Sequence, residues 1–195
     1  MSATPSSAAD TLRWVPVDLE AVRGVIQLYR ARRAELVELR RRGESTNFLA
    51  KCKQLFDFLE ARQDGLAYLI EAAIDLASAH GEIGDWASAE PIFEKCVAVR
   101  REVCGPRDET TATALMMLGV AKHGLHKYSE AEALLLECVH IRSEVLGALH
   151  PHFALALMNL AAVYEATDRK PQGAKLRAAA DNIGLPSFFP KSKPT

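Results

Sequence analysis

Apolar residues recur at every third or fourth position through much of this chain, the spacing that places them on one face of a helix. Three such stripes, near residues 69–77, 115–119 and 157–164, each end at a turn that contains Gly or Asp. A second stripe follows the turn and begins near Trp86 in the first unit and near Tyr128 in the second. The pattern therefore predicts successive pairs of antiparallel helices.

The helical pairs are related by a sequence repeat. Ala89-Glu90 recurs as Ala131-Glu132, and the block at 99–105 recurs at 141–147, an offset of 42 residues in both cases. A fixed period of roughly 20–50 residues is typical of a solenoid, in which each unit buries its apolar face by stacking on its neighbours. Such an architecture favours a binding function over a catalytic one.

Small residues occupy repeated positions where helices would cross closely, and an aromatic residue marks the turn before the second helix. The small residues are Ala77, Gly119 and Ala161 in the first helices and Ala89, Ala131 and Gly173 in the second helices. This order of a Leu-small pair, an aromatic residue at the turn and a second small residue resembles the tetratricopeptide repeat. We expect Trp86 to anchor the first clear repeat.

The familiar tetratricopeptide unit has about 34 residues, whereas the 42-residue unit here resembles that of kinesin light chains. The run from Glu137 to Arg142 and the loop His150-Pro151 are the closest match. The resemblance covers roughly residues 66–182 and implies an all-α fold, an α-solenoid of antiparallel helix pairs with about eight helices.

The chain is accordingly divided into four parts. We expect a disordered N-terminal segment (1–17), a leading helical pair (18–65), tetratricopeptide-like repeats (66–182, in units at about 66–109, 110–151 and 152–182) and a C-terminal tail (183–195).

The leading pair is interpreted as a degenerate repeat that caps the first clear one. We expect a first helix over 18–42 and a second over 48–62 with Asn47 as its N-cap. A coiled coil is the alternative, but Arg33 and Arg40 would fall on its apolar contact positions.

Composition narrows the class of protein. A net charge of −1 argues against a general nucleic-acid binder. The chain has no apolar run long enough for a membrane span, and residues 1–17 lack the apolar segment of a secretory signal. We expect an intracellular protein, most simply a cytoplasmic one, with the cytoskeleton or the cilium as further candidates.

No arrangement of residues points to a metal site, a cofactor or a catalytic group. The four cysteines lack the paired spacing of a zinc knuckle and are expected to be reduced, with Cys96 and Cys138 in the core. His123 and His126 share one turn but have no third ligand nearby. Phosphate-binding glycine loops and nucleophile motifs are missing from the sequence. We therefore expect neither enzymatic activity nor a small-molecule substrate.

The resemblance to tetratricopeptide arrays implies that the first helix of each pair lines a concave groove. The inward positions are Glu71, Asp75, Ser78 and Glu82 in the first unit, Thr113, Met117 and Val120 in the second, and Leu155, Asn159 and Ala162 in the third. Acidic residues outnumber basic ones over 64–110. We therefore expect a groove that is acidic at one end and apolar at the other.

A cluster of arginines in the leading pair is a second candidate contact surface, formed by Arg30, Arg32, Arg33, Arg40, Arg41 and Arg42. It could contact phosphate or an acidic protein surface. The favoured interpretation is a solvated helix face supported by Glu35 and Glu38 at pairing distance.

The sequence thus predicts a scaffold or adapter without catalytic activity, whose partner is a protein or peptide bound in the groove. The alternative is a structural subunit of a large assembly, ciliary, cytoskeletal or other, docked by its outer surface.

Overall fold

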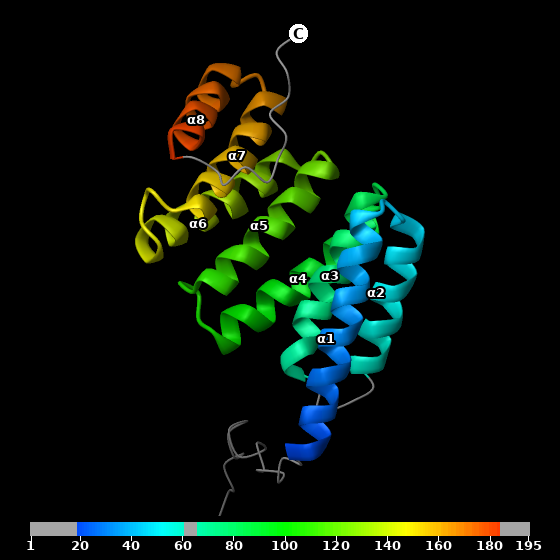
Figure 1. Cartoon of the computed structure of the whole chain (residues 1–195). Helices are drawn as coiled ribbons and strands as arrows, with labels where there is room; N and C mark the ends of the chain where they lie inside the picture. Colours follow the sequence, from blue (N-terminus) through cyan, green and yellow to red (C-terminus); the bar gives the residue numbers. More distant parts are fainter. Residues whose placement is uncertain (1–18, 61–65, 184–195) are drawn as a thin grey trace, which may run out of the picture.

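The computed structural model describes residues 19–60 and 66–183 and shows a curved array of helices (Figure 1). Every regular element in these ranges is a helix, and consecutive helices pack as antiparallel pairs, so the predicted all-α solenoid is confirmed. The predictions for residues 1–17 and 184–195 lie outside the described ranges. The helices are α1 (Leu19–Arg41), α2 (Ser45–Glu60), α3 (Leu66–Glu82), α4 (Trp86–Val103), α5 (Glu109–Gly124), α6 (Tyr128–Val145), α7 (Pro151–Ala166) and α8 (Lys170–Ile183).

The turn within each pair has the same backbone geometry. A residue with positive φ stands in all four turns: Gly43 (71°), Gly84 (80°), His126 (59°) and Asp168 (28°). These residues are 41, 42 and 42 positions apart. The leading pair α1–α2 therefore turns at the position that the repeat would give it.

The start of α2 differs from the expectation. The helix begins at Ser45, so Asn47 lies inside its first turn rather than at the N-cap. The Asn47 side chain donates instead to the carboxylate of Glu44 over 2.7 Å, and the Phe48 amide donates to the Glu44 carbonyl. The positive φ of Gly43 lets the chain reverse sooner than the position of Asn47 suggested.

The later helices begin where the turn residues predict. The Asp85 carboxylate accepts from the Ser88 amide at the start of α4. His150 accepts from the His152 amide through its ring nitrogen, with Pro151 in the first turn of α7. The His150-Pro151 motif therefore works as a helix start, in which proline supplies the helical φ and needs no hydrogen-bond partner.

The repeated Ala-Glu dipeptide has a physical explanation. Ala89 and Ala131 are fully buried, and a Cβ atom added at Gly119 would lie 3.5 Å from the Ala131 carbonyl oxygen, so α5 and α6 of one pair approach closely there. The glutamate after each alanine pairs with the cation of the next turn: Glu90 with Lys127 at 2.7 Å, and Glu132 with Arg169 at 2.6 Å. The repeat thus specifies both a close crossing within a pair and an ion pair between neighbouring pairs.

Trp86 fills the space between α3 and α5. A Cβ atom added at Gly81 or Gly124 would lie 2.4 or 2.5 Å from its ring, so only glycine leaves room for the indole. The same holds at Gly119, where a Cβ would lie 2.8 Å from Leu135 Cγ. The predicted small positions are therefore sites of close packing.

Three apolar clusters stabilise the array. The largest contains buried residues of α3 to α7, the second joins α1 and α2 to α3, and the third joins α7 to α8. Among the described helices none combines the length and the apolarity needed to cross a lipid bilayer.

Candidate partner-binding groove

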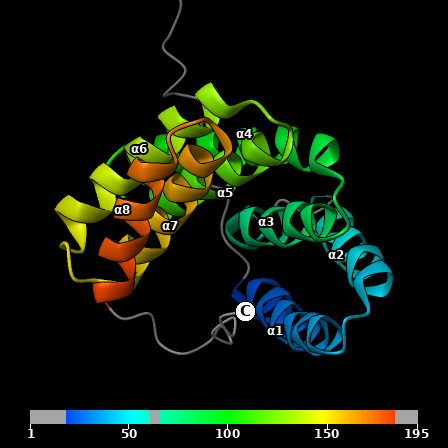
Figure 2. The same cartoon turned by 90° about the horizontal axis from the view of Figure 1, so that it is seen from above.

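The first helices of the pairs lie on the inner side of the curve. Figure 2 shows α1, α3, α5 and α7 around the concave opening, with α2, α4 and α6 outside them. Neighbouring first helices are in contact, α3 with α5 and α5 with α7. The concave surface is therefore built by one helix from each pair, as the tetratricopeptide resemblance implied.

A pocket of about 220 Å³ opens between α3 and α5, and we call it the groove pocket. It brings together four of the residues predicted from the sequence to face the groove. Its lining consists of Arg40, Ser78, Gly81, Glu82, Trp86, Phe93, Met117 and Val120. Trp86, Phe93, Met117 and Val120 give it apolar walls, while the Arg40–Glu82 ion pair supplies a charged edge.

The acidic residues of the groove are not open carboxylates, which differs from the expectation of an acidic end. Glu82 pairs with Arg40 at 2.5 Å, and Asp75 lies 3.7 Å from Arg33. Glu71 pairs with Arg100 of α4. The sequence count did not reveal the partners of these carboxylates, which come from α1 and α4.

Asp75 is the least satisfied of these carboxylates. Its side chain is 18% exposed, and its Oδ2 accepts no hydrogen bond from the described residues. Burial raises the pKa of Asp75, and the nearby Arg33 only partly opposes this. A buried acceptor without a donor costs stability.

The remaining predicted groove residues lie on α5 and α7 and are partly buried. Thr113 accepts from Arg142 at 3.0 Å and is held within the array. The Asn159 amide donates to the Leu155 carbonyl one turn earlier. Leu155 and Ala162 add apolar surface along α7.

The arginine cluster of α1 is largely paired within the protein. Arg32 pairs with Glu35 at 3.1 Å, and Arg41 and Arg42 both pair with Glu38. Arg33 and Arg40 pair with α3, as described above. No ion pair is seen for Arg30 among the described residues. The cluster is therefore mainly a set of ion pairs, which fits the favoured interpretation more closely than an open basic surface.

One side chain important to the architecture was not singled out from the sequence. Arg142 of α6 is 1% exposed and donates to Glu109 at 3.1 Å, to Thr113 at 3.0 Å and to the His152 carbonyl at 2.9 Å. It thus joins α5, α6 and α7. The sequence carried a signal for it, since Arg142 lies in the repeated block and corresponds to Arg100.

Three of the four cysteines lie in the core. Cys52, Cys96 and Cys138 are buried and Cys104 is exposed, and all four are free thiols. Burial raises the pKa of Cys96 and of Cys138 to about 11. The part of the chain that the structure describes contains no group of three or more His, Cys, Asp or Glu side chains placed to hold a metal ion.

The fold and the groove define a class of protein, the helix-pair solenoids that present a concave surface. Residues 68–144 match the tetratricopeptide repeat family model. This part of the chain is similar to tetratricopeptide repeats, and the fold is similar to that of kinesin light chain TPR-like repeats.

Solved structures agree with this fold. The kinesin light chain TPR-like repeats of Podosopora anserina superpose with a TM-score of 0.68 at 18% identity, covering 83% of this chain and 78% of that one. BtubC from P. vanneervenii gives a TM-score of 0.64 at 15% identity, covering 84% of this chain and 69% of that one. At these identities the likeness shows the fold. No curated protein matches the sequence.

The matched repeats narrow the functional class. Tetratricopeptide repeats are generally protein–protein interaction modules, and the fold is typical of scaffolds without catalytic activity.

Proposed function

We propose that this protein is a non-catalytic scaffold that holds a segment of a partner protein in its concave groove. The observation that carries the proposal is the groove pocket. Ser78, Glu82, Met117 and Val120 come from different helices yet line a single apolar cavity of about 220 Å³. A concave apolar pocket with a few polar groups at its edge is the usual form of a binding site.

The chemistry of the pocket indicates what it would hold. An apolar side chain of the partner would contact Trp86, Met117 and Val120, and burial of that anchor would supply most of the affinity. Because Glu82 and Asp75 are already paired with arginines, charge would contribute to orientation and encounter rate more than to affinity. Binding should therefore weaken only modestly with added salt.

Replacement of Met117 tests the groove directly. Partner segments are selected from a displayed peptide library on the wild-type protein and then measured against Met117→Glu. A charge in the pocket should weaken binding at least tenfold, about 1.4 kcal/mol or more. Circular dichroism checks that the variant is folded. The matched control is Leu149→Glu, at a loop position that is 84% exposed.

The control also tests the alternative, a subunit of a large assembly docked by its outer surface. Val103, Val145 and Leu149 are 72%, 50% and 84% exposed near the ends of α4 and α6, and they would supply apolar contacts there. A partner that is lost with Leu149→Glu and retained with Met117→Glu would contradict the groove proposal and support this one.

A further inference from the structure

The helices α5 and α7 begin with the same geometry, but their caps differ in chemistry. Asp108 and His150, the two capping residues, lie 42 positions apart, which is the period of the repeat. Asp108 Oδ1 accepts a hydrogen bond from the Thr110 amide at 2.8 Å. His150 Nδ1 accepts the equivalent bond from the His152 amide at 3.1 Å. One repeat position therefore carries a carboxylate before the second repeat and an imidazole before the third.

The hydrogen bond that His150 accepts defines the state of its ring. An imidazole nitrogen accepts only while it carries no proton, so His150 caps α7 as a neutral ring with its proton on Nε2. A proton on Nδ1 removes the acceptor and brings a positive charge to the N-terminus of α7, where the helix dipole disfavours it. Imidazole side chains change charge between about pH 5 and 8. The hydrogen bonds from Thr110 lower the pKa of Asp108, so the cap of α5 stays a carboxylate in that range.

The groups around His150 do not compensate for a charge on its ring. The centroid of the His152 ring lies 5.0 Å from that of His150, and both rings gain positive charge in acid. Glu109 of α5 lies 3.1 Å from His152 Nδ1, and Arg142 of α6 donates to the His152 carbonyl at 2.9 Å. Among the described residues, no carboxylate lies at ion-pairing distance from His150 itself. Further charged or titratable side chains in the last two turns of α6 and α8 are His140, Glu144, Arg177 and Asp181.

We propose that His150 makes the junction between the second and third repeats sensitive to pH: its neutral ring caps α7, and a proton on Nδ1 releases this cap in mild acid. The stabilisation is present while the ring is neutral and is lost as pH falls. Because the His152 carbonyl also accepts from Arg142, loosening of this turn reaches the contact of α7 with α5 and α6. The junction between the first and second repeats, capped by Asp108, does not respond in this range.

Hydrogen exchange measured by NMR on the full chain tests the proposal. Protection factors, which correct for the intrinsic pH dependence of exchange, are compared between about pH 7.5 and about pH 5.5. The amides of residues 152–154, in the first turn of α7, should lose protection about fivefold, the size of effect expected when a helix loses its cap. The amides of residues 110–112, in the first turn of α5, are the internal control and should keep their protection.

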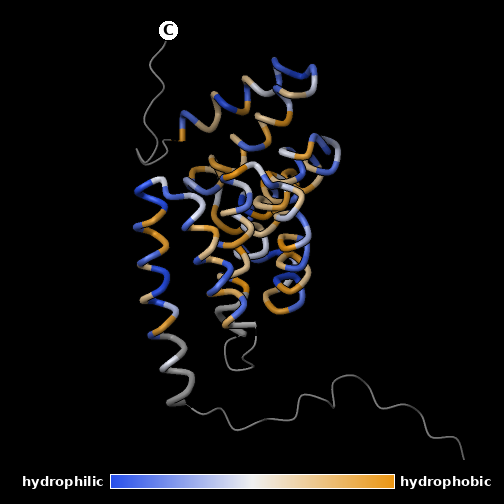
Figure 3. Tube along the Cα trace, turned by 90° about the vertical axis from the view of Figure 1, so that its right-hand side faces the viewer, coloured by the Kyte–Doolittle hydropathy of each residue, from blue (hydrophilic) through white to orange (hydrophobic). Residues whose placement is uncertain are grey.

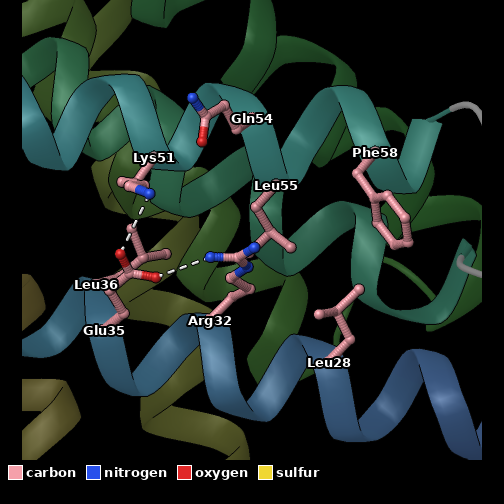
Figure 4. A pocket seen from close by; sticks show the side chains of 8 residues that line it. All are labelled: Leu28, Arg32, Glu35, Leu36, Lys51, Gln54, Leu55 and Phe58. Carbon is pink, nitrogen blue, oxygen red and sulfur yellow. Dashed lines mark hydrogen bonds and ion pairs between the residues drawn. The ribbon is translucent and has the colours of Figure 1, made fainter.

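A second internal control lies at the other end of the array. Arg32 and Lys51 both pair with Glu35 between α1 and α2 (Figure 4). These cations lower the pKa of Glu35, so this contact keeps its charges over the same range. Protection of the α2 amides near Lys51 should therefore stay constant. An equal fall in α2, α5 and α7 would mean a general loss of stability in acid and would overturn the proposal.

Two variants separate the rings of His150 and His152. His150→Asp installs the cap of the preceding repeat and should abolish the fall in protection between the two pH values. His152→Gln removes the contact with Glu109 but leaves the His150 ring, so the fall should persist. A fall that survives His150→Asp, or one that disappears with His152→Gln, would assign the pH response to His152 and overturn the proposal.

The nitrogen-15 NMR signals of the His150 ring test the same point in the wild type, without any variant. At about pH 7.5 the Nδ1 signal should be that of a nitrogen without a proton. The pH at which Nδ1 gains its proton should match the pH at which the His152 amide loses half of the protection that the cap provides. A proton already on Nδ1 at about pH 7.5, or protection of α7 that is constant throughout the titration, would contradict the proposal.

Discussion

Arginines form ion pairs in two regions of the molecule, between α1 and α3 and around Arg142. The environments of these arginines differ. Arg33 and Arg40 of α1 have side chains 48% and 57% exposed and pair with Asp75 and Glu82 across the edge of the groove. The Arg142 side chain is 2% exposed and satisfied by α5 and α7 together. An exposed pair contributes little to stability because water and salt compete for it, whereas breaking a buried pair leaves an unsatisfied group.

The apolar packing around the two groups of arginines also differs. In Figure 3, α1, the helix that leads into the grey N-terminal trace, has long hydrophilic stretches between hydrophobic ones. Among the described residues, α1 packs in the cluster it shares with α2 and α3, while the central cluster extends from α3 to α7. We infer that the end of the groove formed by α1 is the part that opens most easily.

Matched substitutions in the two regions give the largest expected difference. Arg142→Met should lower the free energy of unfolding by about 3 kcal/mol or more, because Glu109 and Thr113 lose their buried donor. Arg40→Met should lower it by no more than about 1 kcal/mol, as expected of an exposed pair. Urea unfolding monitored by circular dichroism measures both. Equal losses of unfolding free energy in the two variants would show that burial of the arginine does not determine how much its ion pair contributes.

Two carboxylates should respond to pH in opposite directions. Arg169 lowers the pKa of Glu132, so the stability that Glu132 provides is present above its ordinary pKa near 4.5 and is lost as pH falls through the lowered value. Burial raises the pKa of Asp75, so its ionisation removes stability as pH rises from its ordinary value near 3.8 through the raised one.

Amide substitutions measure this contrast. Glu132→Gln should destabilise the protein at pH 7 by up to about 1 kcal/mol, and the cost should disappear in acid. Asp75→Asn should stabilise the protein at pH 7 and have little effect below pH 4. Thermal melting at several pH values tests both. Destabilisation by Asp75→Asn at pH 7 would mean that the carboxylate is better satisfied than its geometry indicates.

Added salt should have the smallest effect on the protein, and that effect should be confined to α1. Screening shortens the range of charge interactions from about 10 Å at 0.1 M salt to about 3 Å at 1 M. Hydrogen exchange in α1 should therefore accelerate with added salt, while exchange in α5 and α7 stays nearly constant. A uniform change along the chain would contradict a separate opening of α1.

The sequence by itself determined the repeat and most of the packing that the repeat requires. The period placed the helix pairs, and the small residues Ala77, Ala89, Ala131 and Ala161 are all fully buried in the structure. Trp86 was identified at the turn and lies against two glycines that leave room for its ring. These features depend on residue size and on helical spacing. Both can be inferred from positions that are close together in the sequence.

The start of α2 was not determined in this way. Both Glu44 and Asn47 can interact with free amide groups at a helix start, and the choice between them depends on the conformation of Gly43. A residue type alone does not reveal the φ angle that the fold imposes on it.

Only the tertiary structure decided the chemistry of the candidate groove. The arginines that pair with Asp75, Glu82 and Glu71 lie 29 to 42 positions away in the sequence, and many other pairings would fit the same composition. An ion pair depends on distance in space, which the repeat fixes only after the helices have packed. The charge balance of the groove, and the pocket that Met117 lines within it, therefore became visible only in the folded array.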